Sequence, residues 1–149
     1  MVFRTAFRVL GNAADAQDVT QDVFLEAVSS GPRLKVRSWG AYLRKLTVFR
    51  ALDRRRQRRD DLGLEADHFP ATALSPPDEA VRRELAESLR SLISSLPARE
   101  GAVFVLRYFE RLTNPQIAEV LGISTGAVAA AIHKVRTKLE SVITPNSPG

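Results

Sequence analysis

The stretch QIAEVLGIS, residues 116–124, decides the fold of the second half of the chain. Thr113 and Gln116 have the spacing of a capping box, which predicts the start of a short helix. Gly122 suits a left-handed helix end, and Ser124 suits the N-cap of a longer helix. The inward side of that longer helix is expected to carry Val128, Ile132, Val135 and Leu139. This pattern is typical of a helix-turn-helix, whose second helix enters the DNA major groove.

The second helix offers candidate DNA contacts of two kinds. Its first turns carry short side chains, with Ala129, Ala130 and Ala131 in a row, which can make only apolar base contacts. Its later turns are basic and can contact phosphates. The candidate DNA-binding residues here are Thr125, Gly126, Ala129, His133, Lys134, Arg136 and Lys138. An ordinary helical hairpin with a solvated basic end is the alternative interpretation.

Working outward, every other periodic segment also indicates helix. Helices are expected near residues 3–10, 15–30, 38–58 and 81–95, and a fifth after Pro97. Phe3, Ala6, Phe7 and Leu10 form the apolar stripe of the first. The sequence therefore predicts an all-α fold of two small helical domains. The expected limits are 1–59 and 81–143 for the domains, 60–80 for an acidic linker with prolines, and 144–149 for a tail.

Charge is distributed in blocks along the 149 residues. Residues 1–59 have 13 basic and 5 acidic residues (+8), 60–80 have six acidic and no basic residues (−6), and 81–149 have 9 and 6 (+3). Cysteine is absent and only two histidines occur, so no disulfide, metal site or cofactor is expected. No run has the ~20 apolar residues of a membrane span, and no secretory leader is visible. A cytoplasmic protein with an anionic partner is the expected class.

Two helices of the first lobe carry opposite charges. Asp15, Asp18, Asp22 and Glu26 form an acidic stripe, which suits either helix-dipole complementarity and solubility or a basic protein partner. The helix near 38–58 combines arginines with aromatic residues, a pattern that suits nucleic acid. Its candidate DNA-binding residues are Trp39, Arg44, Lys45, Arg50, Arg54, Arg55 and Arg56, whereas Tyr42 and Phe49 are expected in the core.

Together these motifs resemble the extracytoplasmic-function group of bacterial RNA polymerase sigma factors. The resemblance rests on residues 7–25, 51–54, 96–109 and 117–139, at the separations that the family shows. It implies a transcription initiation factor without catalytic residues, whose first lobe binds core RNA polymerase and the minus-ten promoter element. The implied polymerase-binding residues are Asp15, Asp18, Gln21, Asp22, Phe24 and Leu25. The helix-turn-helix would bind the minus-thirty-five element, and an anti-sigma factor is a further candidate partner.

Three features depart from the family pattern. The chain starts late relative to the usual first helix, Phe49 replaces a common Asn, and residues 129–131 replace a Lys-Ser-Arg-like run. A degenerate sigma-like protein that reads promoters weakly is therefore one alternative. A stand-alone helix-turn-helix regulator is another. An enzyme has no support, because neither a Gly-rich phosphate loop nor a paired acid and base is evident. The inferred location is the bacterial cytoplasm, at the nucleoid during initiation.

Overall fold

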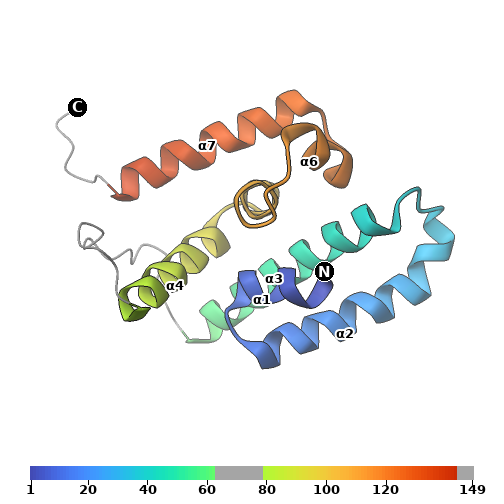
Figure 1. Ribbon diagram of the computed structural model, residues 1–149, viewed down its shortest axis with the longest axis horizontal. Helices are drawn as coiled ribbons and strands as arrows, with labels where there is room; N and C mark the ends of the chain where they lie inside the picture. Colours follow the sequence, from blue (N-terminus) through green and yellow to red (C-terminus); the bar gives the residue numbers. More distant parts are fainter. Residues whose placement is uncertain (63–78, 144–149) are drawn as a thin grey trace.

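The computed structural model describes residues 1–62 and 79–143, and every regular element within these two ranges is a helix (Figure 1). The all-α prediction is confirmed. The first lobe, residues 1–62, comprises α1 (Val2–Leu10), α2 (Ala13–Ser30), the 3-10 turn η1 (Gly31–Leu34) and α3 (Trp39–Leu62). The second lobe, residues 79–143, comprises α4 (Glu79–Ser95), α5 (Ala98–Phe104), the π-helical turn η2 (Val105–Phe109), α6 (Asn114–Leu121) and α7 (Thr125–Ile143). The expected tail and most of the expected linker lie outside the described residues.

Local signals account for most helix ends. The Asn12 side chain accepts a hydrogen bond from the Asp15 amide at 3.0 Å, so α2 begins at Ala13, slightly before the predicted start. Both hydrogen bonds of the predicted Thr113–Gln116 capping box are present at the start of α6. Gly122 ends that helix with a φ of 67°, a left-handed conformation that glycine adopts without steric cost.

Ala6 and Leu10 of the predicted α1 stripe are buried, but two other predictions need correction. In α1, Phe3 and Phe7 are each 41% exposed and stack on one another outside the core, and Thr5 and Val9 are buried instead. The face of α1 that packs against the core is therefore shifted by about one residue from the predicted face. The fifth helix is also interrupted, because η2 widens its last turn before Glu110.

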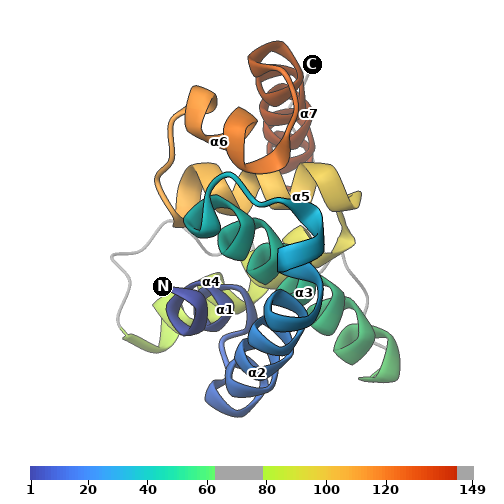
Figure 2. The same cartoon turned by 90° about the vertical axis from the view of Figure 1, so that its right-hand side faces the viewer.

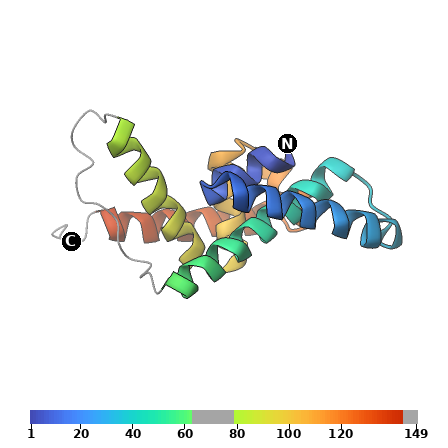
Figure 3. The same cartoon turned by 90° about the horizontal axis from the view of Figure 1, so that it is seen from below.

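The two lobes share one hydrophobic core. Buried side chains from α1, α2 and α3 form a single cluster with those from α4 to α7. The α5 helix lies between α3 and the α6–α7 pair, as Figure 2 shows. Gly101 permits this approach, since a Cβ there would lie 3.4 Å from the Leu52 side chain and 3.3 Å from the Ile93 carbonyl oxygen. Seen from below, α4 projects from one end of the molecule and α2 extends along the other (Figure 3).

Within residues 1–62 and 79–143, no single helix is long and apolar enough to cross a bilayer. The α6 and α7 helices reach that threshold only as a pair, with a 106° bend between them.

Candidate protein and nucleic-acid interfaces

The outward face of α2 combines acidic and large apolar side chains. Val19, Val23 and Ala27 are buried, which fixes the helix's rotation and turns its other side to solvent. Phe24 is 47% exposed, Leu25 70% and Val28 77%. We define the α2 outer patch as Gln21, Asp22, Phe24, Leu25 and Val28, all exposed. Val28 was missed by the sequence analysis, although its position four residues after Phe24 on the same helix face was visible there.

The acidic stripe of α2 divides into outward and inward members. Asp22 is exposed, and the Asp18 side chain is 57% exposed while contacting Arg54 at 3.3 Å. Asp15 and Glu26 instead face α3. The Arg50 Nε and Nη2 donate to the two carboxylate oxygens of Glu26, at 3.1 and 2.8 Å. Part of the stripe therefore binds this chain's own arginines, a possibility that the sequence analysis did not consider.

Asp15 is the most enclosed member of the stripe. It is 9% exposed and accepts hydrogen bonds from Arg54, at 3.0 Å, and from Arg58. Burial raises the pKa of this carboxyl, but the hydrogen bonds and positive charges of the two guanidinium groups outweigh it and hold the pKa below its ordinary value. Asp15 thus lies inside the first lobe and does not belong to the exposed α2 outer patch.

Six described arginines of α3 contact other groups of the chain, although Arg50, Arg54 and Arg58 stay about two fifths exposed: Arg44, Arg50, Arg54, Arg55, Arg56 and Arg58. Arg54 reaches Asp15, and hydrogen bonding to that carboxylate raises its own pKa further. Arg44, Arg55 and Arg56 reach the second lobe instead, and Arg55 is only 7% exposed. The α3 arginines predicted to bind DNA therefore largely contact the chain's own carboxylates and carbonyl oxygens.

The N-terminal end of α3 is the accessible part of this basic surface. Trp39 is 49% exposed and packs edge-to-face on Tyr42, with ring centroids 5.7 Å apart. A groove of about 390 Å³ runs between this end of α3 and α6. Its lining includes Lys35, Arg37, Lys45, Tyr42 and Glu119. Three cations beside an aromatic ring suit a phosphate backbone with unstacked bases.

The helix-turn-helix has the expected geometry. The 106° bend between α6 and α7 is within the range of such motifs. Exposed residues on α7 include Thr125, Gly126, Ala129, Ala130, His133, Lys134, Arg136 and Lys138. Ala131, which follows Ala129 and Ala130 in the sequence, is by contrast 5% exposed and belongs to the core.

Two basic side chains of α7 contact polar side chains of α5 and η2. The Arg136 Nε donates to the Tyr108 hydroxyl at 3.1 Å, and the Lys134 Nζ lies 4.0 Å from a Glu100 carboxylate oxygen. Both heads nevertheless remain exposed at the surface. For residues 1–62 and 79–143, no group of three or more potential metal-ligating side chains is found.

Comparison with known proteins assigns the chain to a family. The model of sigma-70 region 2 matches residues 1–60, and the model of sigma-70 region 4 matches residues 86–139. The chain belongs to the sigma-70 family of RNA polymerase sigma factors, in its extracytoplasmic-function (ECF) group. Members of this family are transcription initiation factors.

Individual relatives agree with this assignment. The ECF RNA polymerase sigma factor SigW of Bacillus subtilis is 27% identical, over 93% of this chain and 80% of its own length. SigE of Mycolicibacterium smegmatis is 30% identical, over 98% of this chain and 58% of its own length. SigD of Mycobacterium tuberculosis is 26% identical, over 86% of this chain and 63% of its own length. The chain thus spans about three fifths of SigE and SigD.

Proposed function

We propose that the chain binds core RNA polymerase through the α2 outer patch and directs it to promoters. The observation that carries this proposal is the exposure of Asp22, Phe24 and Leu25 on the solvent side of α2, away from buried Val19 and Val23. Large apolar side chains flanked by the Asp22 carboxylate suit a partner surface that is apolar at its centre and basic at its edge. Sigma-70 region 2, which matches residues 1–60, supports this assignment.

Promoter DNA is the proposed second partner, with a different role for each lobe. Trp39, Lys45 and the groove beside them would hold an opened strand by stacking and phosphate contact. The α7 helix would lie in the major groove, held by His133, Lys134, Arg136 and Lys138. We propose 1–59 and 81–143 as the two functional units, with the bacterial cytoplasm as their location. An anti-sigma factor is a further proposed partner, which rests on the family alone.

Weak reading of the upstream element is a specific form of this proposal. The exposed first turns of α7 offer only short side chains, including Ala129 and Ala130. Such residues discriminate bases less than Arg, Asn or Gln, whose bidentate pairs contribute about 1–3 kcal/mol each. Base substitutions in the upstream promoter element should therefore reduce initiation less than substitutions in the downstream element. Equal sensitivity of both elements would contradict this form.

The docking test uses one reversed charge. Asp22→Arg should weaken binding to core RNA polymerase by tenfold to a hundredfold, about 1.4–3 kcal/mol, because it reverses a carboxylate at the rim of the apolar patch. Glu84→Arg is the matched control, since it makes the same change at an exposed position on α4. Binding is measured by fluorescence anisotropy, and transcription starts are then mapped by sequencing. Equal binding by both variants would exclude the α2 outer patch as the docking surface.

A further inference from the structure

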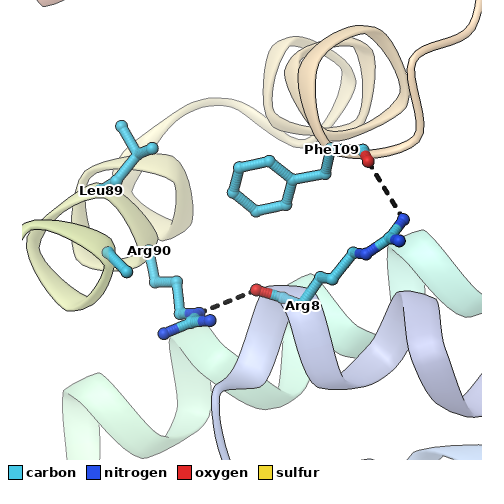
Figure 4. A pocket seen from close by; sticks show the side chains of 5 residues that line it. Arg8, Leu89, Arg90 and Phe109 are labelled. Carbon is cyan, nitrogen blue, oxygen red and sulfur yellow. Dashed lines mark hydrogen bonds between the residues drawn. The ribbon is translucent and has the colours of Figure 1, made fainter. Parts of the chain in front are cut away.

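A small cavity lies between α1, α4 and η2. Its lining comprises Arg8 of α1, Phe109 of η2, and Ala86, Leu89 and Arg90 of α4. The Phe109 ring points toward Leu89, and Arg8 and Arg90 lie on the α1 side of the ring (Figure 4). The volume is about 200 Å³, and Leu89 and Phe109 are only partly buried, so the cavity opens to solvent. Protein interiors are normally filled without spaces of this size, and this space is therefore available to a ligand.

The walls of the cavity are mainly apolar. Leu89 and Phe109 pack against the edge of the hydrophobic core, and Ala86 adds a methyl group beside them. The two arginines also contribute the aliphatic parts of their side chains. An apolar cavity of about 150 Å³ is large enough to bind benzene. The cavity of about 200 Å³ therefore has room for one aromatic ring, or a short aliphatic chain, together with a small polar group.

Arg90 brings to this cavity a cation that the chain neutralises incompletely. Its side chain is only 20% exposed, and its Nη1 lies 3.8 Å from a carboxylate oxygen of Glu87, which is too far for a hydrogen bond. Its Nε donates to the Arg8 carbonyl oxygen at 2.8 Å, the one hydrogen bond of this side chain within residues 1–62 and 79–143 (Figure 4). The guanidinium group therefore keeps donor capacity for a further acceptor.

The local balance of charge at Arg90 is positive. Two guanidinium groups, those of Arg55 and Arg90, share the single carboxylate of Glu87. Burial, the largest effect, and the positive charge of Arg55 lower the pKa of Arg90, although Glu87 opposes them. An anion beside Arg90 would offset this excess charge and accept charge-assisted hydrogen bonds. Arg8 is by contrast already paired with Glu110 at 2.6 Å, so the free cationic capacity belongs to Arg90.

We propose that this cavity binds a small amphipathic carboxylate, with its apolar part between Leu89 and Phe109 and its carboxylate on Arg90. Burial of the apolar part supplies the driving force, and the cation fixes the orientation of the ligand. A neutral apolar molecule or a small polar anion satisfies only one of these requirements. Because the ligand binds the folded chain, it stabilises that chain in proportion to its occupancy. This inference goes beyond the proposed function and does not depend on RNA polymerase.

Three probes separate the two requirements. Phenylacetate has a ring and a carboxylate, 2-phenylethanol has nearly the same shape without the charge, and acetate has the charge without the ring. Each is titrated into the isotope-labelled full chain, and backbone amide shifts are followed by NMR. We expect phenylacetate to shift the amides of residues 86–90 and Phe109 saturably, and to bind at least about tenfold more tightly than the other two probes. At about ten times its Kd, the midpoint of thermal unfolding should rise by about 3–5 °C.

Two substitutions test the site in different ways. Arg90→Gln replaces the cation by a neutral amide and should weaken phenylacetate binding by about tenfold while leaving 2-phenylethanol binding nearly unchanged. Leu89→Trp fills the cavity and should abolish binding of both probes. Arg83→Gln is the matched control for charge, because it makes the same change at an α4 position whose side chain is 80% exposed. Circular dichroism establishes that each variant keeps its helices, and Arg90→Gln carries the test if Leu89→Trp does not.

Three results would overturn the proposal. One is the absence of saturable phenylacetate shifts at residues 86–90 and Phe109. Another is equal affinity for phenylacetate and either of the other probes, which would show that the cavity does not select for a ring and a charge together. The third is the same phenylacetate affinity in Arg90→Gln as in Arg83→Gln, which would place the bound anion elsewhere on this basic chain.

Discussion

The carboxylate of Asp15 is enclosed by two guanidinium groups, and its ionisation is therefore coupled to folding. Because its pKa is lower in the folded chain than in the unfolded chain, the ionised group contributes stability above the unfolded pKa, about 3.8. That contribution is lost as the pH falls through the folded value. From the sequence, Asp15 could not be distinguished from Asp18 or Asp22, since all three belong to one acidic stripe. What separates them is that Asp15 faces α3 whereas the other two face solvent.

Replacing Asp15 should destabilise the first lobe without affecting exposed surfaces. Asp15→Asn leaves Arg54 and Arg58 without their shared anion and should lower the free energy of unfolding by about 1.5–3 kcal/mol at pH 7. The difference from the unsubstituted chain should shrink below about pH 4. Urea unfolding at several pH values measures both effects. Asp22→Asn, an exposed control, should stay within about 0.5 kcal/mol, and an equal loss in both would contradict this account.

Adjacent alanines on α7 offer a second comparison between single residues. Ala130 is exposed and Ala131 is 5% exposed, so lysine should act differently at each. Ala130→Lys should steepen the salt dependence of duplex DNA binding by about 0.9, the contribution of one phosphate contact on B-DNA. Ala131→Lys should instead cost at least about 1–3 kcal/mol of stability through overpacking. Thermal unfolding measures the loss of stability, and DNA titration at several salt concentrations measures the phosphate contact. Equal stability and equal salt dependence in the two variants would refute the assigned rotation of α7.

At the scale of elements, η1 and the start of α3 are joined by one close contact. A Cβ added at Gly31 would lie 2.4 Å from the Trp39 ring, whereas one added at Gly40 would meet nothing nearer than 3.9 Å. Gly31→Ala should therefore displace the ring, and Gly40→Ala should not. Trp39 is the only tryptophan, so its fluorescence emission measures the displacement directly. Identical spectra for the two variants would show that the ring does not rest on Gly31.

Elements whose ends depend on neighbouring residues could be predicted from the sequence, and those that depend on distant packing could not. The capping box at Thr113, the left-handed Gly122 and the Ser124 cap each act within a few residues, and all three are present. The π-helical turn η2 has no comparable local signal. The exposure of Phe3 and Phe7 likewise reflects which side of α1 meets α2 and α3, a matter settled by tertiary packing.

At the scale of the whole molecule, charge totals for each lobe did not reveal where the charges pair. The +8 of the first block predicted anion binding, but Arg50, Arg54 and Arg58 are satisfied by α2, and Arg55 by α4. Ion pairs between residues 24 to 43 positions apart produce no periodic pattern in the sequence from which they could be predicted. The family, the helices and the helix-turn-helix could therefore be inferred from the sequence, whereas the contact between the lobes required coordinates.

A shared core predicts that the lobes unfold together. Leu52 of α3 is 1% exposed and packs where α5 crosses, so Leu52→Ala should cost about 2–5 kcal/mol. Helical circular dichroism reports both lobes and Trp39 fluorescence reports the first. The two signals should give one coincident transition, before and after the substitution. Separate midpoints would show that the core is divided, and Leu25→Ala at an exposed site supplies the control for truncation itself.

The wide turn of η2 has a consequence for how the contact between the two lobes varies among related chains. Its register is closed by the Glu110 amide on the Val105 carbonyl oxygen at 3.0 Å and the Leu112 amide on that of Leu106 at 2.9 Å. The Glu110 carboxylate pairs with Arg8 of α1 at 2.6 Å. Each residue turns a helix by about 100°, so deleting one residue from 105–109 would rotate Glu110 away from Arg8 while leaving it in the sequence. The length of the 105–109 segment, more than any single side chain, should therefore distinguish relatives whose lobes can make this contact from relatives whose lobes cannot.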